Sequence, residues 1–160
     1  MTENITEFVR SHIGQSNDNN EKLFEWCCNA VNEWKPKAQY DNENEYRDDL
    51  FDYLEERNKR FGLNYIIKKE AGRGLADIGV NNRVAIEVKK DLRHKSQVDR
   101  TKGQVETYFG AKFYGVIIAL VGRTDASHRN ELEEGLKRLS TGRGKYKIIE
   151  KPVSNPEVQK

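Results

Sequence analysis

The stretch LADIGVNNRVAIEVK, residues 75–89, decides how the rest of the chain is organised. Two apolar, β-prone runs flank a pair of asparagines, a pattern that predicts an antiparallel hairpin. Three charged side chains interrupt the runs: Asp77, Glu87 and Lys89. Because burying an unpaired ion is costly, three charges in such strands require either a solvated face or a shared chemical task.

The hydrophobic pattern selects the register of this hairpin. A two-residue loop would pair the apolar face of one strand with the charged face of the other. A three-residue loop, residues 81–83, instead pairs Val80 with Val84 and sets Asp77 opposite Glu87. Since a one-residue slip flips every side chain, the three-residue loop is predicted, and asparagine suits the left-handed position it contains.

In this register two carboxylates, Asp77 and Glu87, face each other and repel. A divalent cation between them would turn the repulsion into ligation, and carboxylate oxygens suit Mg²⁺ or Mn²⁺. Lys89 lies two residues beyond Glu87 on the same face, where it could polarise a water or stabilise charge on a phosphate. The alternative interpretation is an exposed hairpin whose outer face carries salt bridges.

The residues Ala76-Asp77 followed by Glu87-Val88-Lys89 resemble the signature of the PD-(D/E)xK nuclease superfamily. Ala76 stands where the superfamily usually has proline. The resemblance implies an α/β fold with a restriction-endonuclease-like core, a mixed central sheet in the order αβββαβ flanked by helices. It also implies Mg²⁺ or Mn²⁺ held by Asp77, Glu87 and the Val88 carbonyl, with Lys89 as a catalytic residue.

A helix preceding the hairpin is predicted to begin at Asp41-Asn42 and to run to about Lys59. Nucleases of this superfamily often take one more acidic residue from such a helix. Glu43 has the core-facing phase for that catalytic and metal-binding role, and Glu45 is the second choice. Acidic residues also favour a helix N-terminus through the helix dipole alone.

The helix after the hairpin is predicted to start at Ser96, with Asp99 completing a capping box. It carries Gln104 and Tyr108, which match the QxxxY motif of the RecB-type branch of the same superfamily. That resemblance implies that both residues contact DNA. Gly103, in mid-helix, costs about 1 kcal/mol relative to alanine, so we expect another backbone to approach closely there.

Charge is unevenly distributed although the net charge is only +2. Residues 1–58 carry 6 Lys and Arg against 14 Asp and Glu, whereas residues 59–102 carry 12 against 5. The positive block contains the hairpin, which is where DNA should bind if the chain is a nuclease. Within it, Arg73 in a glycine-rich turn and Arg93 and Lys95 after the hairpin are predicted DNA contacts.

The chain divides into three predicted parts. Residues 1–40 form an N-terminal helical extension with a loop at 14–20, residues 41–150 form the nuclease-like core, and residues 151–160 form a disordered tail. Within the core, the apolar run 113–121 predicts a strand that is buried on both faces and parallel to its neighbour.

The function predicted from these features is a metal-dependent DNA nuclease, either an exonuclease or a structure-specific endonuclease. The alternative is a catalytically inactive nucleic-acid-binding or assembly subunit with the same fold. No apolar run is long enough to span a membrane and no secretory signal is present, so a cytoplasmic protein is expected. The adjacent Cys27 and Cys28 are too few for a metal cluster. The acidic N-terminal helices could pair with the basic block of a second copy, giving a possible homodimer.

Overall fold

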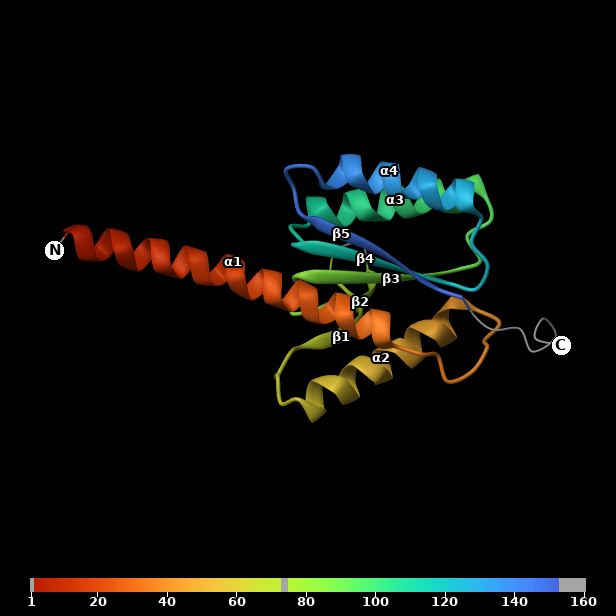
Figure 1. The fold of residues 1–160 in the computed structure, drawn as a ribbon, viewed down its shortest axis with the longest axis horizontal. Helices are drawn as coiled ribbons and strands as arrows, with labels where there is room; N and C mark the ends of the chain where they lie inside the picture. The colour runs from red at the N-terminus through yellow and green to blue at the C-terminus, as the bar shows by residue number, and fades with distance from the viewer. Residues whose placement is uncertain (1, 73–74, 153–160) are drawn as a thin grey trace.

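The structure, a computed structural model, describes the backbone of residues 2–72 and 75–152 and the side chains of residues 18–72 and 75–152. Within this part of the chain, a five-stranded mixed sheet has α1 and α2 on one face and α3 and α4 on the other (Figure 1). The elements in chain order are α1 (Thr2–Glu33), α2 (Glu43–Arg60), β1 (Ile67–Ala71), β2 (Ala76–Val80), β3 (Val84–Lys90), α3 (Lys95–Gly110), β4 (Gly115–Val121), α4 (Ala126–Ser140) and β5 (Lys145–Lys151).

The strands lie in the sheet in the same order as in the chain. β1, β2 and β3 form an antiparallel meander, and β4 and β5 then continue parallel to β3 through the crossover helices α3 and α4. This confirms the prediction of an α/β fold with a mixed central sheet, and β4 is buried along its whole length as expected. Regular pairing of β1 with β2 begins at Ile67.

Alternation along the strands divides the core into two layers, because successive side chains point to opposite faces. Ile78, Val84 and Ile86 pack in the layer beneath α1 and α2, together with Trp34 and Leu50. The strand residues that alternate with them face α3 and α4. The buried residues of this second layer include Ala85, Val116, Ile118 and Leu120 of the strands and Val105, Tyr108 and Leu132 of the helices. The central strands β3 and β4 are therefore covered on both sides.

The hairpin between β2 and β3 has the predicted register. Val80 pairs with Val84 and Ile78 with Ile86, so residues 81–83 form a three-residue loop. Asn81 and Asn82 adopt φ values of 53° and 52°, the left-handed region that asparagine tolerates better than most residues. The hydrophobic pattern thus predicted the pairing correctly.

The N-terminal segment differs from the prediction in two ways. A continuous helix, α1, runs through residues 14–20, where a loop was expected. In addition, Leu23, Cys27 and Trp34 are buried in the same layer as the sheet residues. The buried side chains of α1, between Leu23 and Val31, therefore belong to the core.

Three smaller expectations change as well. β5 extends to Lys151, so the tail predicted from that residue can begin only later, and residues 153–160 lie outside the described residues. α3 begins at Lys95 rather than Ser96, and Gln97 Oε1 accepts from the His94 N–H at 2.9 Å in place of the expected box with Asp99.

No helix in the described part of the chain is long and apolar enough to cross a membrane.

Candidate functional site

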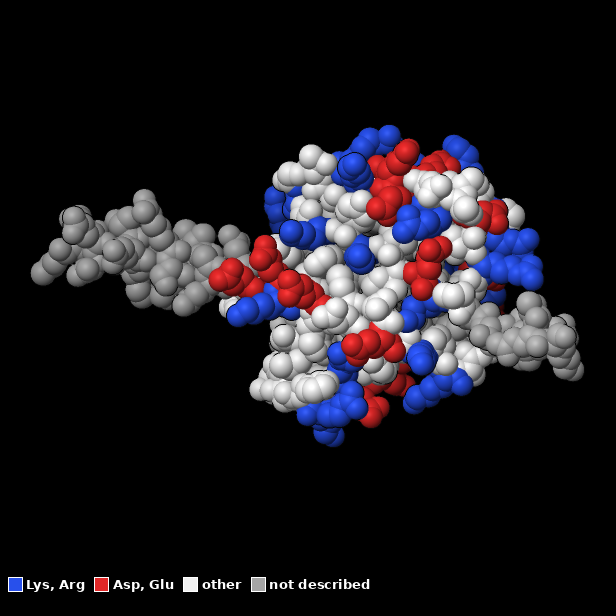
Figure 2. All heavy atoms as spheres, viewed as in Figure 1, with Lys and Arg blue, Asp and Glu red and all other residues white. Residues whose placement is uncertain are grey.

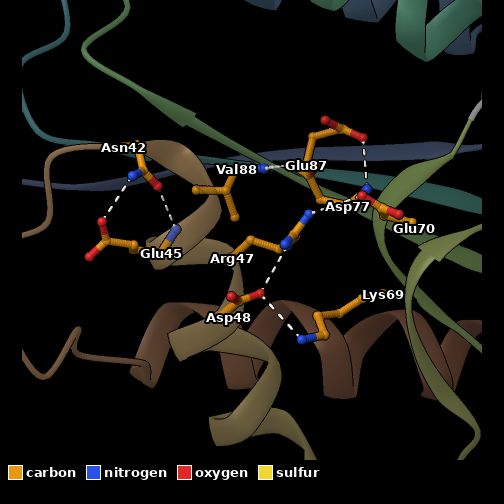
Figure 3. Close-up of polar contacts among 9 residues, drawn as sticks. All are labelled: Asn42, Glu45, Arg47, Asp48, Lys69, Glu70, Asp77, Glu87 and Val88. Carbon is orange, nitrogen blue, oxygen red and sulfur yellow. Dashed lines mark hydrogen bonds and ion pairs between the residues drawn. The ribbon is translucent and has the colours of Figure 1, made fainter.

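Strands β2 and β3 separate where the predicted carboxylates lie. Regular pairing ends at Ile78–Ile86, and two side-chain hydrogen bonds then take over. The Asp77 N–H donates to Glu87 Oε1 at 3.0 Å, and the Val88 N–H donates to Asp77 Oδ2 at 2.8 Å (Figure 3). Each carboxylate thus satisfies a peptide N–H of the opposite strand, and the structure brings Asp77 and Glu87 together as the sequence predicted.

Glu87 is a buried carboxylate with only 1% of its surface exposed. Tyr108 of α3 donates its hydroxyl to Glu87 Oε1, and Lys89 Nζ lies 3.7 Å from Oε2. Burial, reinforced by the negative charge of Asp77, raises the pKa of Glu87 to about 7 against the partial opposition of Tyr108 and Lys89. Burial and the charge of Glu87 also raise the pKa of the Tyr108 phenol. The positive charge near Glu87 is therefore too small to offset its burial and the negative charge of Asp77.

Lys89 lies on the same face of β3 as Glu87. In the parallel ladder with β4, Glu87 pairs with Ile118 and Lys89 with Leu120, and both partners belong to the layer covered by α3 and α4. Lys89 is only 7% exposed. A buried ammonium is costly unless it is paired with a negative charge. Lys89 and Glu87 form such a pair at this end of β3, with 3.7 Å between Nζ and Oε2.

The two candidate carboxylates at the start of α2 have different partners. Glu43 is half-buried, and its Oε1 accepts from the Lys90 N–H at the end of β3 at 3.1 Å. Glu45 is exposed and forms a reciprocal cap with Asn42: its N–H donates to Asn42 Oδ1 and its Oε1 accepts from Asn42 Nδ2, each at 2.9 Å (Figure 3). The structure therefore supports Glu43 as the helix carboxylate directed toward β3, whereas Glu45 holds the helix end.

The carboxylates around β3 differ in how well they could hold a divalent cation. Among the described residues, no three His, Cys, Asp or Glu side chains are grouped closely enough to hold a metal ion, so Glu43 does not form one cluster with Asp77 and Glu87. The carboxylates of Asp77 and Glu87 do lie close together, because each accepts a hydrogen bond from the strand that carries the other. The Val88 N–H points toward β2, and in an extended strand the carbonyl of the same residue points the same way. Two carboxylates and one carbonyl fit an ion such as Mg²⁺, which keeps several of its own waters.

The predicted DNA contacts are not all at the surface. Arg93 and Lys95 are exposed, and Lys95 Nζ lies 3.7 Å from Asp99 within α3. Tyr108 is fully buried against Glu87. Gln104 is half-buried, and its Oε1 is a buried acceptor with no hydrogen-bond partner among the described residues. Arg73 lies outside the described residues.

Surface charge does not form one continuous basic patch on the face shown in Figure 2, where Lys and Arg lie among Asp and Glu. The positive block of residues 59–102 is divided among α2, β1, β3 and α3.

One charged residue near the site was missed from the sequence. Arg47, one helical turn after Glu43, has a side chain only 15% exposed. Its guanidinium lies 3.4 Å from Glu70 and 3.1 Å from Asp48, and Lys69 also approaches Asp48 at 3.4 Å (Figure 3). The only sequence signal was the i, i+4 spacing from Glu43, which places both side chains on one face of α2.

Comparison of the chain with protein-family models, with curated proteins and with solved structures found no match. The chemistry open to this chain is therefore inferred from the geometry of Asp77, Glu87, Lys89 and Glu43.

Proposed function

We propose that the protein is a Mg²⁺- or Mn²⁺-dependent DNA nuclease with a restriction-endonuclease-like core. The observation that carries the proposal is the separation of β2 and β3 at Asp77 and Glu87, with Lys89 beside them. A carboxylate whose pKa is raised by its burial and by a second carboxylate is typical of a functional site rather than of a structural hairpin. The order of elements, a helix, three antiparallel strands, a helix and a parallel strand, agrees with this core.

In this proposal Asp77, Glu87 and the Val88 carbonyl hold the metal ion, and Glu43 acts through a water. The ion supplies a bound water of lowered pKa and positive charge for the scissile phosphate. Glu43 already accepts from the Lys90 N–H, so its carboxylate is held at the end of the same strand that carries Glu87.

The remaining roles fall to positive side chains of the chain itself. Lys89 presents a buried ammonium, and in a site of low polarity such a charge stabilises the negative charge that builds up on a phosphate in the transition state. Arg93 and Lys95 are exposed beyond the end of β3, where they can contact the sugar–phosphate backbone. The resulting reaction is hydrolysis of a DNA phosphodiester bond.

A second candidate function is a nucleic-acid-binding or assembly subunit that lacks activity. It is favoured by a specific observation: the described residues contain no three-residue metal-binding group, and Glu87 is engaged by Tyr108 and Lys89. In that case the Lys89–Glu87 pair is a buried structural ion pair. Metal dependence separates the two functions.

The test is a cleavage assay on labelled single-stranded, duplex and branched DNA, with Mn²⁺ or with EDTA. Glu87→Gln and Lys89→Met keep side-chain size while removing charge, and each is expected to reduce cleavage at least about 100-fold, since each acts directly on the reacting groups. Circular and end-labelled substrates distinguish endonuclease from exonuclease activity.

Glu43→Gln and Glu45→Gln provide a matched pair on the same helix turn. We expect Glu43→Gln to reduce cleavage at least about 10-fold, in the range typical of groups that orient metal ligands. Glu45→Gln should cleave like the wild type, because that side chain serves the α2 cap. DNA binding without cleavage in Mn²⁺ would support the second candidate function instead.

A further inference from the structure

The two residues of the QxxxY motif were predicted to face DNA, but the structure directs Tyr108 inward. Its side chain is fully buried, its hydroxyl donates to Glu87 Oε1, and its ring packs edge-on against Phe113 at a centroid distance of 5.8 Å. A tyrosine in this position has no surface through which to contact a polynucleotide. Its polar contact is with a carboxylate that the proposed reaction requires.

The path of α3 extends this inward orientation to the other motif residue. Because α3 connects the parallel strands β3 and β4, it runs antiparallel to β3. Gln104 lies one helical turn before Tyr108, and its Oε1 is a buried acceptor that lacks a partner among the described residues. Because of the direction of α3, Gln104 lies on the side of Tyr108 toward which β3 runs from Glu87 to Lys89.

The hydrogen bonds at Glu87 also select which of its oxygens is available. Oε1 accepts from both the Asp77 N–H and the Tyr108 hydroxyl. Oε2 accepts no hydrogen bond from the described residues and has Lys89 at 3.7 Å. Tyr108 consequently fixes the rotation of the carboxylate and leaves one defined oxygen for another ligand.

We propose that Tyr108 is a positioning residue that holds the Glu87 carboxylate in the orientation needed to bind the divalent cation, so that the motif on α3 acts on the site and not on DNA. The inference rests on the proposed function. Groups that hold metal ligands by hydrogen bonds typically contribute about 10- to 100-fold to metal affinity or activity.

The test compares Tyr108→Phe with Tyr146→Phe. Tyr108→Phe deletes one oxygen and keeps the ring that packs on Phe113. Tyr146→Phe is the matched control. Tyr146 lies on β5, away from the site, and its hydroxyl also donates to a carboxylate, that of Glu133 on α4, at 3.0 Å. Mn²⁺ affinity is measured by titration calorimetry without DNA, and DNA affinity by fluorescence anisotropy in EDTA.

We expect Tyr108→Phe to weaken Mn²⁺ binding about 10- to 100-fold and to leave DNA affinity in EDTA within about 2-fold of wild type. Cleavage by Tyr108→Phe should recover in part at high Mn²⁺, and Tyr146→Phe should match wild type in every measurement. In a Glu87→Gln background, adding Tyr108→Phe should have no further effect on Mn²⁺ binding.

Two results would overturn the inference while leaving the proposed function intact: wild-type Mn²⁺ affinity in Tyr108→Phe, or a loss of DNA affinity in that variant with metal affinity unchanged. The second would return Tyr108 to the DNA-binding role that the resemblance implies. A wild-type protein that neither binds Mn²⁺ nor cleaves DNA would overturn the proposed function, and this inference with it. Calorimetry of the wild type alone distinguishes these cases.

Discussion

Glu87 lies at the centre of the site as a buried carboxylate with one ammonium group nearby. The Asp77 carboxylate beside it adds negative charge, so the pair Asp77–Glu87 is only partly neutralised by Lys89. Such an arrangement weakens the folded protein, because neither desolvation nor repulsion is fully compensated. In the proposed function, a bound divalent cation would supply the missing positive charge.

The raised pKa of Glu87 predicts how stability depends on pH. Its folded value is about 7 and its ordinary value is 4.5, so the folded protein holds this proton more tightly than the unfolded chain. The free energy of unfolding should therefore fall as pH rises from about 4.5 to about 7, by roughly 3 kcal/mol from this group. Glu87→Gln should abolish that fall and be more stable than wild type above pH 7 in EDTA.

Urea denaturation in EDTA across pH 4–9 provides the measurement. Glu45→Gln is the control, because Glu45 is exposed and should leave the pH dependence as it is in wild type. The same pH dependence in Glu87→Gln and wild type would contradict the assignment of the raised pKa to this residue.

At the scale of single elements, two glycines differ in what surrounds them. A Cβ on Gly103 of α3 would meet no other atom within 4 Å, so the close backbone approach expected from the sequence is absent there. A Cβ on Gly79 of β2 would lie 2.5 Å from the Cβ of Ala71 on β1. Gly79 therefore permits the contact between the two strands, whereas Gly103 only weakens its helix.

This difference predicts opposite effects of the same substitution. Gly103→Ala should raise the free energy of unfolding by about 1 kcal/mol, the difference in helix propensity. Gly79→Ala should lower it by about 1–3 kcal/mol, because a methyl group is forced into a buried contact between strands. Urea denaturation of the two variants at neutral pH is the measurement, and destabilisation by Gly103→Ala would show a contact that the structure does not contain.

At the scale of the whole molecule, a buried carboxylate joins α1 and the following segment to α2. Asp49 of α2 accepts from the Trp34 indole N–H at 2.9 Å, the Lys37 N–H at 2.8 Å and the Tyr40 hydroxyl at 2.7 Å. Asp49 is 7% exposed. These three bonds tie the segment that directly follows α1 to α2.

Asp49→Ala should therefore reduce the free energy of unfolding by about 3 kcal/mol, because it leaves buried donors without an acceptor. Asp48→Ala is the adjacent control: its ion pairs with Arg47 and Lys69 are partly exposed and should contribute less than about 1 kcal/mol. Thermal and urea unfolding of both variants check the difference. Equal losses in the two variants would mean that the Asp49 contacts do not hold α1 in place.

The sequence by itself determined the register of the hairpin and the meeting of Asp77 with Glu87. These follow from local rules, since a side-chain period of two and the left-handed preference of asparagine act over a few residues. Only the tertiary structure decided that Tyr108 points at Glu87 and that the buried face of α1 is part of the core. Those outcomes depend on which face of one element packs against another that is distant in the chain, and spacing along a single helix does not contain that information.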